Sequence, residues 1–143
     1  MVNCYGFIIL DVLNRKTILV ETPNNNLSYP KGKFEKKKDY TQLDCAIREL
    51  EEETGLKPEQ IDMIPNLILS EINDKKICTI QYYVGIIKNP ITSFIFDTEE
   101  IISVKWYDYD KIFDLDKLKQ SRKDVFFELM QIMNKFWINK NWL

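Results

Sequence analysis

Residues 45–56 read Cys-Ala-Ile-Arg-Glu-Leu-Glu-Glu-Glu-Thr-Gly-Leu, a glutamate-rich run inside a longer helical pattern. Thr41 precedes the pattern with the side chain of a good N-cap, and Asp44 stands three residues later, where it completes a capping box. Gly55 follows the last helical position and is the residue type that ends many helices. The sequence therefore predicts a helix over residues 41–54.

The predicted helix has two faces, because successive residues are about 100° apart. The apolar face, which we expect to pack inward, consists of Leu43, Ile47, Leu50 and Thr54. Glu49, Glu52 and Glu53 fall at positions i, i+3 and i+4 and form one carboxylate patch beside that face. Such close like charges repel one another, and a hard divalent cation such as Mg²⁺ would remove the repulsion and gain oxygen ligands. Taken alone, the patch could equally be a solvated acidic face.

The composition indicates one globular domain. The chain has 143 residues, 45% of them hydrophobic and 13% aromatic, which is enough to bury a core. No apolar run approaches the ~20 residues of a membrane span, and the N-terminus resembles a first strand more than a signal peptide. Cys4, Cys45 and Cys78 are far apart and form no CxxC pair, so we expect reduced thiols in a cytoplasmic protein.

The chain contains no histidine, which excludes histidine-based triads and histidine-ligated metals. Acid–base chemistry must therefore come from carboxylates, lysine, tyrosine, cysteine or a metal ion. The net charge of −2 hides two clusters, five lysines within residues 31–38 and four glutamates within residues 49–53. A basic cluster beside an acidic one suits a polyphosphate held partly by lysine and partly through a metal ion. Two solvated faces are the alternative.

The rest of the chain alternates between strand and turn signals, and we find no repeat and no linker. Strands are predicted over residues 4–11, 17–21, 61–72, 76–88 and 100–108, a loop over 22–40, and a short helical segment over 110–118. A terminal amphipathic helix is predicted over residues 121–138, with Val125, Phe126, Leu129, Ile132, Met133 and Phe136 at helical spacing. This order predicts an α+β fold, an α/β/α sandwich, as a single domain over residues 1–143.

Residues 48–56 resemble the second half of the Nudix box, in which Arg-Glu-apolar-x-Glu-Glu is followed by x-Gly-apolar, and match it at every specified position. Gly32, after Pro-Lys, matches the glycine that starts the box. The resemblance implies the Nudix fold with a mixed sheet. It also implies a pyrophosphohydrolase in which water attacks a diphosphate, with one or more Mg²⁺ or Mn²⁺ ions. The three glutamates of the patch would be metal ligands, and Arg48 would orient them.

The first half of the box departs from the family pattern. Arg48 follows Gly32 by 16 positions where the pattern has 14, so the loop carries a two-residue insertion. The first glutamate of the box has no counterpart from whichever end the count starts, and Asp39 or Glu35 could take its place. In the family this glutamate mostly supports the geometry of loop and helix. The departure therefore bears on loop rigidity more than on catalysis.

A narrower resemblance joins the chain to the catalytic domain of messenger-RNA decapping enzymes. It covers about residues 4–110 and rests on the stretches 5–11, 29–33, 44–49, 72–74 and 100–106. Those enzymes carry a further glutamate before the last strand, which takes part in metal binding and catalysis, and Glu100 occupies that place. A solvated strand entry is the alternative for Glu100. The Pro-Lys-Gly signature is also similar to that of diadenosine tetraphosphate hydrolases.

Substrate contacts follow from the same resemblance. Lys31 and Lys33 flank Gly32 and would face the phosphates as point charges, with a solvated lysine loop as the alternative. The guanine of a cap would need an aromatic face on which to stack. The aromatic candidates are Tyr29, Tyr82 and Tyr83, with burial in the core as the alternative for each.

Two features of this chain differ from those of decapping enzymes. The first strand starts almost at Met1, so we expect no N-terminal regulatory domain. The terminal helix has few basic residues and fits an ordinary packing helix better than an RNA-binding one. Its basic and tryptophan residues are Arg122, Lys123, Lys135, Lys140, Trp137 and Trp142.

The sequence thus predicts a metal-dependent hydrolase that cleaves the 5′ cap of RNA and releases 7-methylguanosine diphosphate. The expected partner is a nucleoside-diphosphate-linked substrate such as capped RNA, with no membrane partner, and the oligomeric state stays open. One alternative is a hydrolase of dinucleoside polyphosphates or diphosphoinositol polyphosphates. Another is an inactive Nudix fold that binds nucleotide or RNA.

Overall fold

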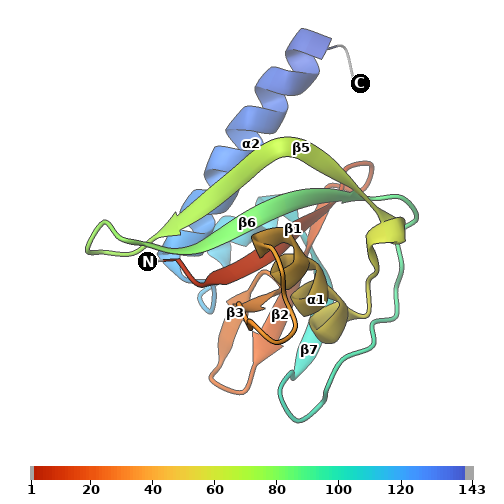
Figure 1. The fold of residues 1–143 in the computed structure, drawn as a ribbon. Coiled ribbons are helices and arrows are strands. Elements are labelled where there is room, and N and C mark those ends of the chain that lie inside the picture. Colours follow the sequence, from red (N-terminus) through yellow and green to blue (C-terminus); the bar gives the residue numbers. More distant parts are fainter. Residues whose placement is uncertain (1, 141–143) are drawn as a thin grey trace.

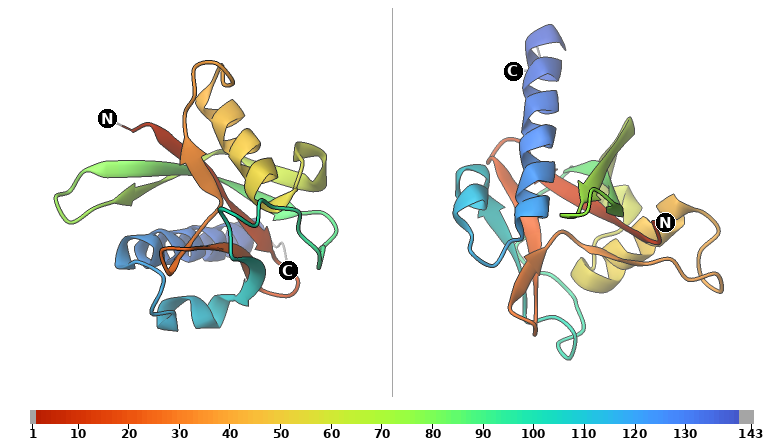
Figure 2. Two further views of the ribbon diagram at one scale, coloured as in Figure 1. Left: turned by 90° about the horizontal axis from the view of Figure 1, so that it is seen from below. Right: turned by 90° about the vertical axis from the view of Figure 1, so that its left-hand side faces the viewer.

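A computed structural model describes the backbone of residues 2–140 and the side chains of residues 2–135. Within this part, a mixed seven-stranded sheet has α1 on one side and α2 on the other (Figures 1 and 2). The elements are β1 (Cys4–Asp11), β2 (Lys16–Thr22), β3 (Asn26–Ser28), β4 (Lys31–Lys33), α1 (Gln42–Thr54), β5 (Ile61–Ile72), β6 (Cys78–Ile87), β7 (Ser103–Asp108) and α2 (Gln120–Lys140). Short 3₁₀ helices cover Pro58–Gln60 and Tyr109–Asp114. The predicted α+β fold, an α/β/α sandwich, is confirmed.

Strand β1 is the centre of the sheet. It runs parallel to β6 along one edge and antiparallel to β2 and β4 along the other. Strand β5 pairs antiparallel with β6, and β3 and β7 pair antiparallel with β2. Gly32 of β4 lies opposite Tyr5 of β1. This pairing fixes the lysine-rich segment before α1 against the sheet.

Side chains of β1 alternate between two cores, as strand geometry requires. Ile8 and Leu10 face the core on the α2 side, and Phe7 and Ile9 face the core on the α1 side. From α2, the buried side chains are Val125, Phe126, Leu129 and Met133, with Ile132 partly buried, as the helical spacing predicted. The predictions for Phe136, Trp137, Lys140 and Trp142 lie outside the described side chains.

The prediction of an uninterrupted loop over residues 22–40 is wrong, because β3 and β4 lie within it. Each strand has only three residues, too few to produce a recognisable alternation in the sequence. A tight turn precedes β3, where Asn25 takes a positive φ of 65°. Pairing with β2 and β1 supplies the hydrogen bonds that these short segments could not form alone.

Helix α1 is capped as the sequence predicted. The hydroxyl of Thr41 accepts a hydrogen bond from the backbone N–H of Asp44 at 3.1 Å, and the Asp44 carboxylate accepts the N–H of Thr41 at 3.0 Å. Gly55 ends the helix in the left-handed conformation, at a φ of 83°. These caps fix both the start and the rotation of the helix that carries the glutamates.

The buried face of α1 is wider than predicted. Leu50 and Thr54 are buried as expected, and Cys45 is buried as well, whereas Leu43 and Ile47 are only half-buried. The cause is β4, which packs against the Cys45 side of the helix, so that the thiol donates to the carbonyl oxygen of Gly32 at 3.6 Å. The side of the helix that bears Glu49 is therefore enclosed.

The three cysteines are free thiols, as predicted. Burial raises the pKa of the Cys45 thiol to about 12, so this thiol is neutral at physiological pH. Across residues 2–140, no helix combines the length and the apolarity of a membrane span.

Candidate metal-dependent active site

An acidic cavity of about 280 Å³ lies beside the C-terminal half of α1. It is lined by Glu49, Glu52, Glu53, Asp97, Glu100 and Ile101. The structure thus brings Glu100, from the segment before β7, to the three glutamates of the helix, although it is about fifty residues away in sequence. Five carboxylates in one small cavity form a set of hard oxygen donors.

Asp97 is the lining residue that sequence reasoning missed. Its backbone carbonyl accepts hydrogen bonds from the N–H groups of Glu100 at 3.1 Å and Ile101 at 2.9 Å, forming a turn. This turn presents Asp97 and Glu100 on the same side. The Asp-x-x-Glu spacing was the available signal, but it recurs too widely in acidic segments to be diagnostic.

Glu53 is the carboxylate most strongly perturbed. Burial is the main cause that raises its pKa to about 7, and the nearby charges of Glu49 and Glu100 raise it further. The backbone N–H of Lys31 opposes this by donating to Oε1 of Glu53 at 3.1 Å. A carboxyl that is only half ionised near neutral pH, next to other acids, is a site where a cation would be favourable.

Glu49 and Glu52 share one cationic partner, Arg48. Glu49 is 12% exposed and accepts from Nη1 of Arg48 at 2.9 Å, whereas Glu52 is 50% exposed and lies 3.3 Å from the same nitrogen. Burial raises the pKa of Glu49, with a further contribution from the charge of Glu52. Arg48 therefore contacts both carboxylates, and its role in orienting them stays a prediction.

Asp39, one of the two candidates for the place of the missing first glutamate, pairs closely with Arg48. Its two carboxylate oxygens accept from Nε and Nη2 of Arg48 at 2.8 and 2.9 Å, a bidentate pair. This contact lowers the pKa of Asp39 to about 2. Glu35 also pairs with Arg48 at 3.2 Å, and the carbonyl oxygen of Lys33 accepts from its Nη2 at 3.0 Å. Arg48 thus joins the inserted loop to α1 through Asp39 and Glu35.

The residues lining the cavity fit a hard divalent cation by their chemistry. Glu49, Glu52, Glu53 and Glu100 could supply its oxygen ligands. Within the described residues, however, no three acidic or thiol side chains already meet in a metal-holding arrangement. The reason is visible in their partners, since Arg48 engages Glu49 and the backbone of Lys31 engages Glu53.

The predicted substrate-binding residues divide into two groups. Lys31 is half-buried, its charge acts on Glu53, and Lys33 is exposed on the same strand. Gly32 between them lies directly against the Glu49 carboxyl group. Lys31 and Gly32 therefore contact glutamates that line the acidic cavity, whereas Lys33 contacts Arg48 through its backbone carbonyl oxygen.

The prediction that Tyr29 stacks against a base is wrong. Its ring is fully buried against Tyr82, with 5.1 Å between ring centroids, and its hydroxyl donates to the carbonyl oxygen of Arg122 at 2.7 Å. Tyr82 is enclosed in the same core, because the inner face of the sheet is covered by α2. Tyr83 points to the other face and stays half-buried.

Gly32→Ala is expected to lower turnover at least about tenfold while the protein still folds. A Cβ at this position would overlap the Glu49 carboxyl, which is the movable end of a side chain and would be displaced from the cavity. Gly6→Ala is the comparison, because its Cβ would overlap the rigid carbonyl of Pro30 and should destabilise the fold instead. Steady-state rates and thermal unfolding of both variants separate these effects, and an unimpaired Gly32→Ala enzyme would contradict the placement of Glu49.

The metal-free protein should lose stability as pH rises from about 5 to 8. The pKa of Glu53 is raised in the folded state from 4.5 to about 7, so its contribution is full below 4.5 and is lost as pH rises through 7. The effect is at most a few kcal/mol, since one pKa unit corresponds to about 1.4 kcal/mol. Because Mg²⁺ competes with the proton, added Mg²⁺ should raise the unfolding temperature more at pH 8 than at pH 6. Equal shifts at both pH values would argue against a metal at Glu53.

Comparison with known proteins agrees with the geometry. The NUDIX domain family model matches residues 3–129, and the chain therefore belongs to the NUDIX family. It is a Nudix hydrolase, a class of pyrophosphohydrolase that generally uses divalent metal ions.

Individual relatives are more distant. A protein of Acanthamoeba polyphaga mimivirus, provisionally named an mRNA-decapping protein, is 33% identical over 93 residues, which cover 58% of this chain and 24% of that protein. The chain thus spans about a quarter of that relative. The Caenorhabditis elegans Ap4A hydrolase in a binary complex has a TM-score of 0.78 at 16% identity, with 92% of this chain and 98% of that chain covered. The NUDIX domain of Shewanella oneidensis NrtR, complexed with ADP ribose, has a TM-score of 0.68 at 12% identity, with 93% and 88% covered. These structural likenesses establish the fold.

Proposed function

We propose that the chain is a Mg²⁺- or Mn²⁺-dependent decapping hydrolase that cleaves the 5′ cap of RNA. The observation that carries this proposal is the placement of Glu100 in the same cavity as Glu49, Glu52 and Glu53. The resemblance to decapping enzymes implies that Glu100 takes part in metal binding and catalysis. The likeness to the mimivirus protein supports the choice of substrate.

The reaction transfers a phosphoryl group to water. Water attacks a phosphorus atom beside the bridging oxygen nearest the RNA, and the bond between that phosphorus and that oxygen breaks. The products are 7-methylguanosine diphosphate and 5′-monophosphorylated RNA. Divalent cations supply charge neutralisation of the phosphates and make the attacking water more acidic. In this proposal Glu49, Glu52 and Glu53 would hold the cation, with Glu100 as a further member of the same site, and Lys31 and Lys33 would bind the phosphates.

Glu100 is the candidate to accept the proton of the attacking water. The carboxylates of Glu49 and Glu53 are held by hydrogen bonds from Arg48 and the backbone of Lys31. Glu100 comes from a different segment and lines the cavity beside them. Its carboxylate forms no hydrogen bond or ion pair with another described residue. A base must reach the water from a side that the cation and its ligands leave open.

The proposal is tested with four substrates, each offered with Mg²⁺ or Mn²⁺: capped RNA, free cap dinucleotide, diadenosine tetraphosphate and a diphosphoinositol polyphosphate. Chromatography of a radiolabelled cap should show release of 7-methylguanosine diphosphate from capped RNA far faster than turnover of the others. Turnover of the small molecules alone would overturn decapping in favour of a small-molecule hydrolase. No turnover of any substrate would indicate a binding module. Glu53→Gln protein, purified identically, controls for contaminating hydrolases.

A further inference from the structure

A second cavity, of about 740 Å³, opens beside the first turn of α1, at the opposite end of the helix from the carboxylates. Its volume is typical of sites for small organic ligands, which run from about 300 to 1,000 Å³. Four aromatic side chains line it, namely Tyr5, Phe34, Tyr40 and Tyr83. No residue of this cavity lines the acidic one.

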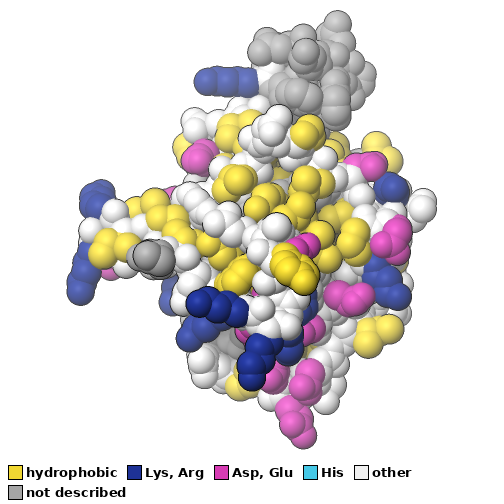
Figure 3. All heavy atoms as spheres, viewed as in Figure 1, with side chains coloured by type: hydrophobic (Ala, Val, Ile, Leu, Met, Phe, Trp, Pro, Cys, Tyr) yellow, Lys and Arg dark blue, Asp and Glu magenta, His cyan; other side chains and the backbone are white. Residues whose placement is uncertain are grey.

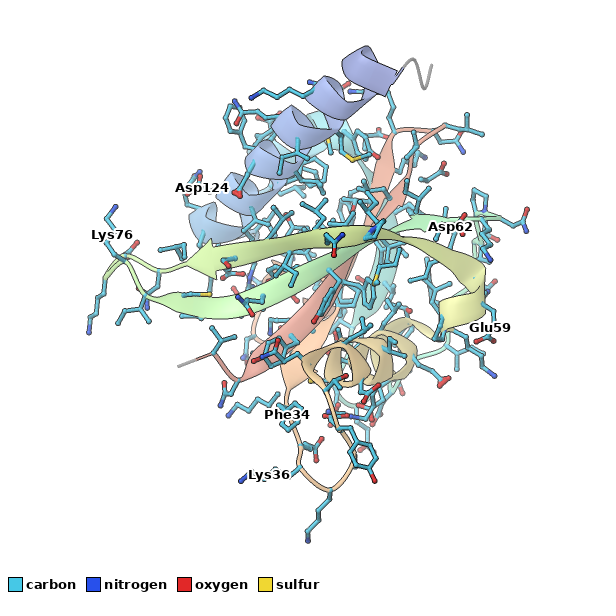
Figure 4. All side chains as sticks on the ribbon, turned by 45° about the horizontal axis from the view of Figure 1, so that its top comes forward. Phe34, Lys36, Glu59, Asp62, Lys76 and Asp124 are labelled. Atoms are coloured by element: carbon cyan, nitrogen blue, oxygen red, sulfur yellow. The ribbon has the colours of Figure 1, made fainter. Side chains whose placement is uncertain are left out.

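The aromatic walls are fixed by the fold. The backbone N–H of Phe34 donates to the carbonyl oxygen of Asn3 at 2.7 Å, and the Tyr5 hydroxyl donates to that of Val2 at 3.2 Å. The rings of Tyr5 and Phe34 meet edge to face, with 6.5 Å between centroids. Phe34 and Lys36 lie on the loop beside α1 (Figure 4). A ligand would therefore enter a site whose rings are already in place, so that little ordering is required on binding.

Tyr40 is the unusual member of this set. It is 96% exposed, so its ring contributes nothing to the core, and it directly precedes the N-cap Thr41. A single exposed aromatic residue is unremarkable on a protein surface. At the mouth of a cavity that already has three aromatic walls, it provides a further flat face on which a planar group can stack.

Two lysines lie at or beside the lining of the cavity, and the second, Lys37, lines a small adjoining cavity together with Lys36 and Tyr40. Lys36 also lines the larger cavity, and among the described residues neither lysine forms an ion pair, whereas Lys38 pairs with Glu35 at 3.8 Å. Figure 3 shows basic side chains gathered on this part of the surface, close to acidic ones. The ligand should therefore combine a planar aromatic group with negative charge. That combination describes a nucleotide better than an apolar peptide.

We propose that this cavity binds a nucleotide of single-stranded RNA, with its base against the aromatic rings and its phosphate beside Lys36 and Lys37. The assignment of that strand as the body of the capped substrate rests on the proposed function, but binding of the strand does not. Helix α1 joins the two sites, and Gln42 and Glu49 are about 10 Å apart along its axis at 1.5 Å per residue. Lys31 and Lys33 lie on the strand that leads into the same loop. An RNA whose cap occupies the acidic cavity could therefore continue toward the aromatic cavity.

The test measures binding by fluorescence anisotropy, using a short uncapped oligouridylate, EDTA to prevent hydrolysis, and low salt. A second probe is an abasic oligonucleotide backbone of the same length. The wild-type protein should bind oligouridylate about tenfold more tightly than the abasic strand, since one stacked base contributes about this much. Tyr40→Ala should remove that preference. Phe127→Ala replaces an aromatic residue on α2 that is 56% exposed, and this variant should keep the preference for oligouridylate.

The lysines are tested by charge removal. Lys36→Gln/Lys37→Gln should weaken binding of both strands and reduce the salt dependence of binding, because fewer counterions are released. The matched control is Lys75→Gln/Lys76→Gln, which changes two adjacent exposed lysines in the turn after β5. This variant should bind both strands as the wild type does.

Three results would overturn the inference. They are equal affinity of the wild type for both strands, an unchanged preference in Tyr40→Ala, and tighter binding of an acidic peptide than of RNA. The last result would indicate a protein partner instead. Capped-RNA hydrolysis is scored separately. Binding without hydrolysis would leave this site standing while the proposed function fails, and hydrolysis without binding would do the reverse.

Discussion

Glu53→Gln should lower hydrolysis by about 10²-fold or more, because the variant loses a charged oxygen ligand at the centre of the acidic cavity. The fold should survive. The glutamine oxygen can still accept the N–H of Lys31, as the carboxylate does at 3.1 Å. In EDTA at pH 8 the variant should even unfold at a higher temperature than wild type, since it no longer buries a carboxylate whose pKa is raised to about 7. Initial rates with Mg²⁺ and thermal unfolding with EDTA measure the two effects.

Glu51→Gln is the matched control for this variant. Glu51 lies on the same helix but is exposed and does not line the cavity. It should keep wild-type turnover and wild-type stability. If Glu53→Gln hydrolysed substrate at the wild-type rate, Glu53 would have no part in the reaction.

Arg48→Ala should destabilise the protein by roughly 3 kcal/mol, because it leaves several buried or half-buried acceptors without their cation. Arg48 is only 15% exposed, and it joins the loop to α1 through Asp39 and the carbonyl oxygen of Lys33. Activity should fall as well, since Glu49 loses the contact that orients it. Urea unfolding measures the stability, and steady-state kinetics measure the activity.

Combining variants isolates the Arg48–Asp39 pair. Asp39→Asn alone should cost less than Arg48→Ala, because the arginine keeps its other carboxylate partners, and the double variant should cost less than the sum of the two. Lys88→Ala provides the control, since Lys88 pairs with Asp62 at 3.8 Å with both side chains largely exposed, and should lose little stability. If Arg48→Ala changed the free energy of unfolding by less than about 0.5 kcal/mol, the loop would be held in place by other contacts.

The helix was predictable because its signals are local. A capping box at one end and a glycine at the other fix its bounds within the residues that flank it, and the spacing of the glutamates then follows. The long strands were predictable for a similar reason, since their β-branched residues recur over many positions. Glu100 was located through family resemblance, because no local pattern links it to a helix that ends more than forty residues earlier.

What could not be predicted depends on how distant segments meet. Asp39 reaches Arg48 only because the inserted loop folds back over α1, a path that no local pattern encodes. Tyr29 and Tyr83 both stand in aromatic segments, yet one faces α2 and the other faces α1, which depends on sheet register. The aromatic cavity has no local signature in the sequence, because its four rings come from three separate parts of the chain.

The most direct test of the metal site is anomalous diffraction from crystals soaked in Mn²⁺. The expected result is a Mn²⁺ peak inside the cavity lined by Glu49, Glu52, Glu53 and Glu100, with at least two of these carboxylates turned toward it. The peak should vanish in crystals of Glu53→Gln. A protein that hydrolyses substrate in Mn²⁺ but shows no peak in this cavity, or shows its ion elsewhere, would contradict the assignment.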